Sequence, residues 1–504
     1  MPGTPIRAIR SNEPLRRRGR DLDIRPIALV IGYVLIVIAA AMLLPMVVDM
    51  VVGHSDWEVF FISFLITLFF GVALVLMNRA EPVDQFGARE AFLLTTLSWL
   101  SVAVFATMPF YLSELSLTLG ESFFEAMSGL TTTGSTVIVG LDRAPPGVLM
   151  WRALLQWMGG IGIIVLGIVV LPMLNVGGMQ LFRTESSDHS EKILPRAGQL
   201  ASAIGSLYLT LTLLCGIAYW LGGMTGFEAT AHAMTTIATG GYSTSDASIG
   251  HFQSAFIEWT AIAFMILGGL PFVVLIRFLN GDHAAPLRDH QLRWFLGMLL
   301  AAWLILCVWL FITAPYLDGH TVVRWVIFSS TSVMTGTGYA VTDYGTWGPL
   351  AIAVFYFLMS VGGCTGSTTG GIKVFRFAVL YSTTILQVRR LIQPSGVFRP
   401  TFEGRLLPEA AMVSVLAFFF VFAVSFSVIV IALSLFDLSF ITAMSSALTA
   451  LANVGPGLGP QVGPASTFAD LPEGAKWVMA FAMLLGRLEL FTVLVLFAPA
   501  FWRV

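Results

Sequence analysis

Charged side chains are scarce in this chain of 504 residues. Asp, Glu, Lys and Arg make up 11% of the sequence, whereas 57% of the residues are hydrophobic. A soluble globular protein carries about 25% charged residues, because water must hydrate its surface. A larger core does not explain the deficit, since a soluble chain of this length would still need a charged surface. The composition therefore excludes a soluble protein and predicts a polytopic membrane protein.

Cysteine is also rare, and the common metal and enzyme motifs are missing. The three cysteines, Cys215, Cys307 and Cys364, all fall in apolar segments. None forms a CxxC pair or a Cys/His spacing typical of zinc or redox sites, so we interpret them as buried free thiols. The apolar segments contain no HExxH or GxGD motif and no convincing Ser/His pair, so the sequence does not favour an enzyme.

Long apolar runs are abundant, and a helix needs about 20 such residues to cross a bilayer. The first run follows a basic N-terminus, is longer than a signal-peptide core and has no small-residue cleavage site, so we expect an uncleaved first helix. The candidate spans are 27–51, 58–77, 91–112, 150–174, 201–222, 254–280, 294–315, 347–392 (interrupted), 409–435 and 475–500.

Four segments too short to span a bilayer recur between these spans, at 121–130, 227–237, 322–334 and 438–451. Each leads into a Gly- or Thr-rich strand, and the four strands read LTTTGS (130–135), IATGGY (237–242), MTGTGY (334–339) and LANVGP (451–456). A unit of helix, short helix, strand and helix is thus written four times. Four such units in one chain predict an all-α membrane protein whose strands surround one axis.

The strands have the chemistry of a cation filter. A pore must replace the water shell of a cation with oxygens, and stacked backbone carbonyls do this at modest cost. Glycine permits the backbone angles that aim successive carbonyls at one axis. The preceding short helices point their partly negative C-terminal ends inward, which also favours a cation. No ring of acidic residues accompanies the strands, so the sequence does not favour a carboxylate filter for divalent ions.

Lys and Arg residues indicate the orientation, because they concentrate on the cytoplasmic side of membrane proteins. One side collects Arg7, Arg10, Arg16, Arg17, Arg18, Arg20, Arg25, Arg79, Arg89, Arg183, Lys192, Arg196, Arg277, Arg288, Arg293, Arg389, Arg390, Arg399, Arg405 and Arg503. The opposite loops are expected to hold only Arg143, Arg152, Arg324 and Lys476. We therefore expect both termini in the cytoplasm and the four strands toward the outside. The basic N-terminus is interpreted as a contact with anionic lipid and not with nucleic acid.

The eighth span is interrupted by SVGGCTGSTTGGIK (360–373), which is too rich in glycine and hydroxyl residues for a regular helix. Irregular backbone at membrane depth is tolerated only inside protein or beside water. We therefore expect this loop to face the interior, where its glycines Gly362, Gly363, Gly366, Gly370 and Gly371 would let it act as a gate. The alternative is a glycine patch for helix packing.

Charged residues within apolar segments also suggest roles. Arg487 is expected near the middle of the last span, where it either faces the pore or forms a structural ion pair. Glu489 is two residues away and points to another helix face. Lys373 and Arg376 are either gate residues or cytoplasmic-end residues whose charges reach the interface.

The short helices carry ionisable residues of their own, namely Glu125, Glu228 and His232. We expect these side chains to brace the strands by hydrogen bonds and not to bind ions.

Several segments resemble the Trk/Ktr/HKT superfamily of potassium transporters, and among them the TrkH-type subunits of bacterial Trk systems. These segments are FEAMSGLTTTG (124–134), QWMGGIGII (156–164), GGMQLFR (177–183), GGYST (240–244), GGCTGS (362–367), NVGPG (453–457) and GRLE (486–489). The resemblance implies a bacterial inner-membrane protein with two extra N-terminal helices before four pore units. It also implies a homodimer on a cytosolic TrkA-like ring of nucleotide-binding subunits, with one pore in each protomer.

The resemblance further implies which residues bind the transported potassium ion. The filter carbonyls would belong to Thr132, Thr133, Gly134, Thr239, Gly240, Gly241, Gly336, Thr337, Gly338, Asn453, Val454 and Gly455. Sodium-preferring relatives carry serine at the first filter glycine, so Gly134 favours potassium. The third and fourth strands depart from the family pattern, which implies looser selectivity than in a symmetric potassium channel. The family's arginine in the permeation path corresponds to Arg487.

The predicted organisation is 1–90 for the N-terminus and two extra helices, then 91–199, 200–292, 293–405 and 406–504 for the four pore units. Two other functions remain open at this stage: the channel-like subunit of a potassium-pumping P-type ATPase and, remotely, an intramembrane enzyme. The residues fit proton symport, sodium symport and channel-like flow equally well.

Overall fold

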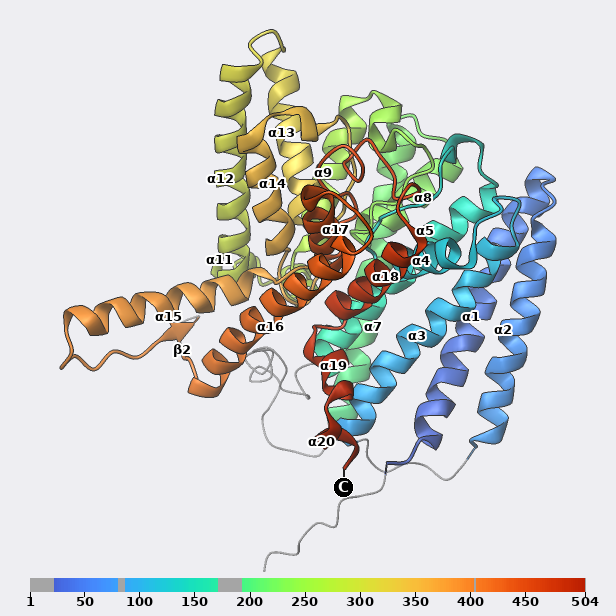
Figure 1. Ribbon diagram of the computed structural model, residues 1–504, viewed down its shortest axis with the longest axis horizontal. Coiled ribbons are helices and arrows are strands. Elements are labelled where there is room, and N and C mark those ends of the chain that lie inside the picture. The colour runs from blue at the N-terminus through green and yellow to red at the C-terminus, as the bar shows by residue number, and fades with distance from the viewer. Residues whose placement is uncertain (1–21, 80–86, 171–192, 403–404, 504) are drawn as a thin grey trace, which may run out of the picture.

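The computed structural model describes residues 22–79, 87–170, 193–402 and 405–503, and this part of the chain is predominantly helical (Figure 1). The helices of the first half are α1 (Arg25–Val52), α2 (Trp57–Met77), α3 (Ala88–Leu112), α4 (Leu119–Leu130), α5 (Pro146–Val165), the π-helical η2 (Leu166–Val170), α7 (Ile193–Leu221), α8 (Gly226–Ile237), α9 (Ala255–Gly269) and α10 (Phe272–Leu279). Those of the second half are α11 (Ala285–Arg288), α12 (His290–Thr313), α13 (Gly319–Met334), α14 (Pro349–Val361), α15 (Val374–Ile392), α16 (Glu409–Ser434), α17 (Phe440–Ala452), α18 (Glu473–Arg487), α19 (Phe491–Leu494) and α20 (Pro499–Trp502).

Short elements complete the chain. They are the 3-10 helices η1 (Leu141–Arg143), η4 (Ser248–Phe252), η5 (Tyr344–Thr346) and η6 (Val495–Phe497), and the antiparallel pair β1 (Thr401–Phe402) and β2 (Arg405–Leu406). The N-terminal arginines before Leu22, the segment 177–183 and Lys192 lie outside the described residues.

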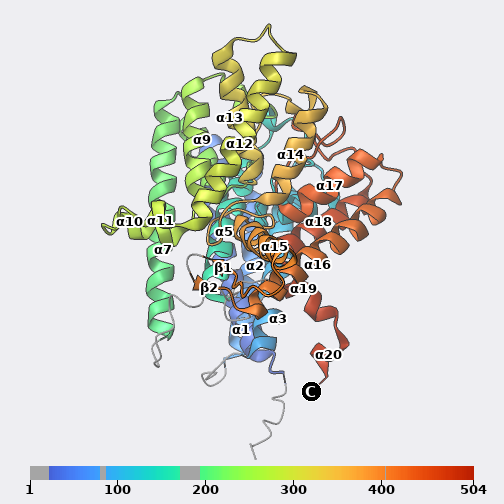
Figure 2. The same cartoon turned by 90° about the vertical axis from the view of Figure 1, so that its left-hand side faces the viewer.

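The predicted spans are confirmed for most of the chain. Among the described residues, seven helices are long and apolar enough to cross a membrane, or up to nine if two bent pairs each count as one span. The predicted interruption of the eighth span is also confirmed, because α14 and α15 are separated by the non-helical residues 362–373. The helix α15 runs away from the bundle in Figure 1 and is seen nearly end-on in Figure 2.

Two spans predicted as continuous are broken. The span 254–280 bends by 101° between α9 and α10, where Pro271 lacks an N–H donor and holds Leu270 in an extended conformation. The span 475–500 bends by 107° after α18, where Glu489 and Leu490 both have positive φ angles. Arg487 is therefore the last residue of α18 and not the middle of a long helix, as the sequence had suggested.

The four short helices α4, α8, α13 and α17 form as predicted, and each has a recognisable start. Thr118 and Thr225 close capping boxes with the glutamates three residues later. The side chains of Asp318 and Ser439 accept hydrogen bonds from the first turns of α13 and α17. The predicted fold class, four units of helix, short helix and helix with two additional N-terminal helices, is confirmed.

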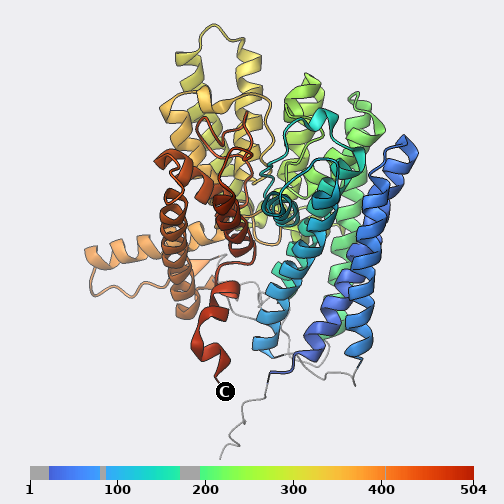
Figure 3. The same cartoon turned by 45° about the vertical axis from the view of Figure 1, so that its right-hand side comes forward.

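The additional helices α1 and α2 pack closely against each other and form the blue pair at the edge of the bundle in Figure 3. Gly32 and Gly71 meet at their crossing: a Cβ atom added to Gly71 would lie 3.1 Å from the carbonyl oxygen of Gly32 and 2.9 Å from Cγ1 of Ile36. Small residues permit this backbone approach, which is how helices associate in lipid. At its far end α1 reaches the pore units, because Oδ1 of Asp49 accepts a hydrogen bond from the N–H of Gly147 (2.6 Å).

We predict that Gly71→Leu destabilises the protein, because the larger side chain forces α1 and α2 apart. Overpacking of this kind costs about 1–3 kcal/mol. A lower melting temperature of the detergent-purified variant is the measurement. Val72→Leu is the matched control, since Val72 is exposed on the same helix. Equal melting temperatures for the two variants would show that the crossing tolerates a large side chain.

Candidate functional site

The strands that follow the four short helices share one backbone conformation. In each strand, two residues with positive φ flank one residue without it. The first are Thr132 (52°), Thr239 (50°), Gly336 (70°) and Asn453 (54°), and the second are Gly134 (87°), Gly241 (76°), Gly338 (79°) and Gly455 (107°). Glycine adopts such angles freely, asparagine less readily, and threonine only with strain, so their repetition in all four strands indicates a common structural demand.

Each strand is anchored to its own short helix by the same hydrogen bond. The N–H of the central strand residue donates to the carbonyl five residues earlier. The four pairs are Thr133 to Ser128 (2.8 Å), Gly240 to Thr235 (2.9 Å), Thr337 to Ser332 (2.9 Å) and Val454 to Thr449 (3.1 Å). The four units therefore present the same backbone despite different side chains.

The strands also contact one another in a closed ring. The last glycine of each strand lies against the central carbonyl oxygen of a neighbouring strand. An added Cβ atom would lie 2.1 Å from the oxygen of Gly240 at Gly134, 1.7 Å from that of Thr337 at Gly241, 2.3 Å from that of Val454 at Gly338 and 2.8 Å from that of Thr133 at Gly455. No side chain fits at these distances, so the strands surround one axis and require glycine at all four positions.

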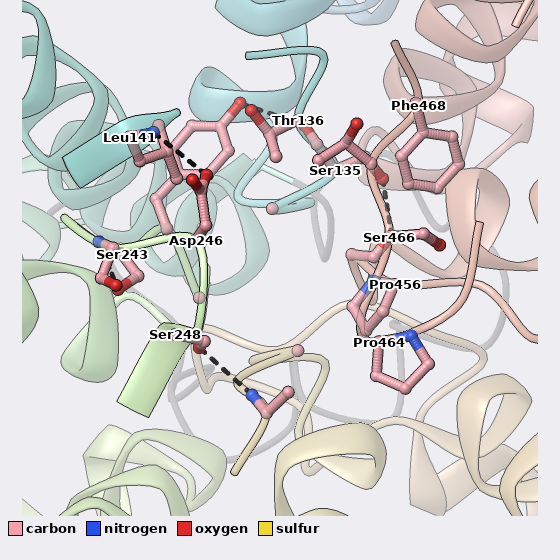
Figure 4. Close-up of a pocket in the computed structure, with 18 of the residues that line it drawn as sticks. Ser135, Thr136, Leu141, Ser243, Asp246, Ser248, Pro456, Pro464, Ser466 and Phe468 are labelled. Carbon is pink, nitrogen blue, oxygen red and sulfur yellow. Dashed lines mark hydrogen bonds between the residues drawn. The ribbon is translucent and has the colours of Figure 1, made fainter. Parts of the chain in front are cut away.

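One side of the ring opens into a hollow of about 80 Å³, lined by residues of all four units (Figure 4). A buried water needs only about 10–15 Å³ of such space, so the hollow has room for several water molecules. Asp246 lies at its rim, and its Oδ1 accepts hydrogen bonds from the N–H groups of Gly140 (3.2 Å) and Leu141 (3.0 Å). Of the two charged residues that line the hollow, Asp246 is the exposed one.

The other charged residue, Arg152 of α5, forms a buried ion pair behind the first strand. Its Nε lies 2.7 Å from Oε1 of Glu125, and both side chains are at most 1% exposed. The carboxylate of Glu125 also accepts hydrogen bonds from the hydroxyl of Thr136 and the N–H of Val137. The guanidinium lies 3.9 Å from the ring centroid of Tyr242, and its Nη1 donates to the carbonyl of Ser243. Glu125 thus holds the residues directly after the first strand, in line with the predicted bracing role, and the ion pair links them to the second strand.

Of the other two residues expected to brace the strands, one does so. His232 bonds through Nε2 to the hydroxyl of Ser243 (3.0 Å), just beyond the second strand. The prediction is wrong for Glu228, whose carboxylate accepts hydrogen bonds from Thr225 at the opposite end of α8.

The Gly-rich loop between α14 and α15 lies directly against the strands. The hydroxyl of Thr239 donates to that of Thr368 (3.0 Å), and a Cβ atom added to Gly370 would lie 2.4 Å from the carbonyl oxygen of Ala452. The loop is fastened to the break between α9 and α10, where the N–H of Cys364 donates to the carbonyl of Gly269 (3.1 Å). Because the loop is not helical, its interpretation as a helix-packing patch is wrong.

Arg487 is 2% exposed, and within the described part of the chain none of its guanidinium nitrogens has a hydrogen-bond partner. Among the described residues no acidic side chain pairs with Arg487, so the alternative of a structural ion pair is not supported. Glu489 instead contacts Lys373 (Nζ to Oε1, 3.2 Å) and Arg376. Lys373 and Arg376 are both buried, so they are not cytoplasmic-end residues reaching the interface.

Three of the four cations expected in outer loops lie within helices and contact acids. Besides Arg152 with Glu125, Arg324 contacts Glu258, and Nζ of Lys476 lies 2.7 Å from Oε1 of Glu121. These pairs were not predicted from the sequence, and neither was the contact of Gln156 with the second strand. Arg152 and Gln156 lie four residues apart in an apolar span, and polar residues so spaced face one side of a helix, a signal that was available.

Comparisons with known proteins agree with this geometry. The family described as TrkH, cation transport protein, matches residues 56–504. The chain is 44% identical over 479 residues to the Trk system potassium uptake protein TrkI of Halomonas elongata, covering 95% of this chain and 97% of that protein. It is 36% identical over 487 residues to the Trk system potassium uptake protein TrkH of Escherichia coli (strain K12), covering 96% and 100%. The crystal structure of the potassium transporter TrkH from Vibrio parahaemolyticus superposes with a TM-score of 0.89 at 33% identity, covering 96% and 100% of the two chains.

We predict that Arg152→Met destabilises the protein, because it leaves the Glu125 carboxylate buried without its counter-charge. Removing one partner of a buried pair costs roughly 3–5 kcal/mol. Arg143→Met, at an exposed position, should leave the melting temperature unchanged.

The double variant Glu125→Gln with Arg152→Met should recover part of this loss, since no charge then remains unpaired. A double variant less stable than Arg152→Met alone would contradict the assignment of the two side chains as an ion pair.

Proposed function

Because the chain belongs to the TrkH family of cation transport proteins, we propose that it takes up potassium across the bacterial inner membrane through a pore within each protomer. The observation that carries the proposal is the closed ring of four strands, each anchored by the same bond to its short helix. Its relatives are named for potassium uptake by the Trk system, and they align over nearly the whole chain. These relatives favour the Trk function over the subunit of a potassium-pumping ATPase.

The ring is proposed as the filter. Backbone carbonyls would replace the water molecules around a potassium ion, because uncharged carbonyl oxygens can compensate for the loss of its hydration shell. The carbonyls proposed for this role belong to residues 132–134, 239–241, 336–338 and 453–455. Two features support this: no carboxylate belongs to the ring, and the short helices end at the strands, where their dipoles favour a cation. Asp246 at the rim would raise the local cation concentration.

The Gly-rich loop is proposed as the gate. It touches the second and fourth strands through Thr368 and Gly370, and these contacts support a position on the path of an ion leaving the ring. Positive φ angles at Gly362, Gly366 and Gly371 show a backbone that only glycine adopts freely, and such residues absorb the angle changes of a moving loop. Gly363 and Lys373 complete the proposed gate.

Arg487 is proposed to hold the closed state. A buried guanidinium without a hydrogen-bond partner among the described residues is costly, and this cost supports a functional use of the charge. Below a cation filter, this charge would raise the barrier to potassium by Coulomb repulsion. The Glu489 contacts with Lys373 and Arg376 connect the end of the gate loop to the break that follows Arg487.

The proposal extends to assembly and orientation. We infer a homodimer on a cytosolic TrkA-like regulatory ring; the words "Trk system" in the names of the relatives support an association with further subunits. The excess of Lys and Arg predicted on one side of the membrane supports cytoplasmic termini. Arg152, Arg324 and Lys476 lie in helices and not in the outer loops, so the difference in loop charge between the two sides is larger than predicted. The four pore units would be 91–199, 200–292, 293–405 and 406–504.

The purified protein with its cytosolic partner should carry rubidium and potassium into proteoliposomes in preference to sodium. Gly134→Ser should reduce this preference, because its Cβ atom would strike the carbonyl of Gly240 and its φ of 87° disfavours any side chain. Gly297→Ser is the control, since Gly297 is exposed on α12, has no positive φ angle, and a Cβ atom there meets nothing within 4 Å. Uptake of sodium alone by the parent protein would refute the proposal, and unchanged selectivity in Gly134→Ser would remove Gly134 from the filter.

Arg487→Ala should keep the fold and increase rubidium uptake in the absence of the cytosolic partner, because the repulsive charge is gone. Arg487→Lys keeps the charge and should keep the low basal flux. Melting temperature and rubidium uptake are measured on the same preparation. An unstable, inactive Arg487→Ala protein would indicate a structural role instead.

A further inference from the structure

The second strand differs from the others in what holds it. In the first and third strands a pair of threonine hydroxyls bond to each other: Thr131 with Thr133 (2.7 Å) and Thr335 with Thr337 (2.8 Å). The second strand has Ala238 and Gly240 at these positions, so it lacks both hydroxyls. It also contains two consecutive glycines, which leave the peptide between them free to rotate.

Gln156 of α5 supplies the missing brace. This side chain is fully buried. Its Nε2 donates to the carbonyl of Gly240 (2.6 Å), and its Oε1 accepts from the N–H of Tyr242 (3.0 Å). One amide thus bonds to both sides of the Gly240–Gly241 pair, as an adjacent β-strand would, and it fixes the peptide that the two glycines leave free.

Gln156 also explains why residue 240 is glycine. A Cβ atom added there would lie 2.3 Å from Cδ of Gln156, whereas the equivalent residues of the other strands, Thr133, Thr337 and Val454, carry side chains. The amide occupies the volume that a side chain at residue 240 would need. The glutamine and the glycine are therefore complementary.

The first, second and fourth units can be aligned at the position of Gln156, and only the first unit has a side chain there that can donate such a hydrogen bond. Gly159, Gly268 and Gly486 lie against the carbonyl oxygens of Leu130, Ile237 and Leu451, respectively. Each of these carbonyls lies two residues before the first positive-φ residue of its own strand, which makes the three glycines equivalent. Three residues before them stand Gln156, Met265 and Met483, all buried. Methionine has a similar length to glutamine but no N–H donor, so it offers no comparable brace.

We propose that Gln156 is a positioning residue that fixes the Gly240 carbonyl in the second strand and thereby contributes to the preference for potassium over sodium. The inference rests on the proposed filter function. Without Gln156, the buried carbonyl of Gly240 and N–H of Tyr242 lose their partners, and the peptide between the glycines reorients to regain them. A filter with one mobile carbonyl adapts to a smaller ion and discriminates less.

The first test is Gln156→Met, which keeps the side-chain length and matches the residue of the second and fourth units. Rubidium and sodium uptake are measured separately in proteoliposomes, with the melting temperature of the same preparation. We expect the rubidium-to-sodium uptake ratio to fall several-fold while rubidium uptake persists. Gln199→Met is the control, because Gln199 is exposed on α7. A ratio equal to that of the parent would overturn the proposal.

The second test uses complementarity. Gly240→Thr should abolish uptake, because its side chain strikes Gln156, and Gly240→Thr combined with Gln156→Ala should regain rubidium uptake with a reduced ratio. If the double variant takes up no more rubidium than Gly240→Thr alone, the proposal is overturned. This second test is the decisive one in the event that Gln156→Met does not fold. Failure of the parent protein to transport rubidium would count against the filter function itself, and is thereby distinguished from both outcomes.

Discussion

The N–H group of the central residue in each strand donates to the carbonyl five residues earlier in its own short helix, and the rest of the site depends on this bond. It satisfies a donor that lies away from water, where an unmet group is costly. It also turns the chain sharply at the helix end and fixes the positive φ angle of the residue before it. With the backbone so turned, the last glycine of each strand reaches the next strand, and the ring closes.

The four units are equal in backbone and unequal in side chains. Threonine pairs stiffen the first and third strands, and Gln156 does so for the second. In the fourth, Nδ2 of Asn453 donates to Thr133 (2.9 Å) and to the carbonyl of Met483 (3.0 Å). Repeated units can differ in this way when they need only the same backbone conformation, because different side chains can stabilise the same φ and ψ angles. The fourth strand is in consequence tied to the first.

Hydropathy and the lengths of the apolar segments predicted the long spans and the short helices, because these depend on local composition. The break at Pro271 also had a local signal, which the apolar run on either side obscured. The break after Arg487 had none, since the positive φ angles of Glu489 and Leu490 arise where Glu489 meets Lys373 and Arg376 from another unit. The site was predicted through its glycines, whereas its ion pairs and the Gln156 contact join residues far apart in sequence. Those contacts became visible only once the units were placed around one axis.

A ring closed by four contacts has a fixed circumference. Each strand takes part in two of these contacts, one through its last glycine and one through its central carbonyl. A single strand therefore cannot bulge outward without opening both, and the bore resists local stretching in every direction. A distortion of one strand therefore meets the combined stiffness of all four units, even though each strand alone is only a few residues of irregular chain.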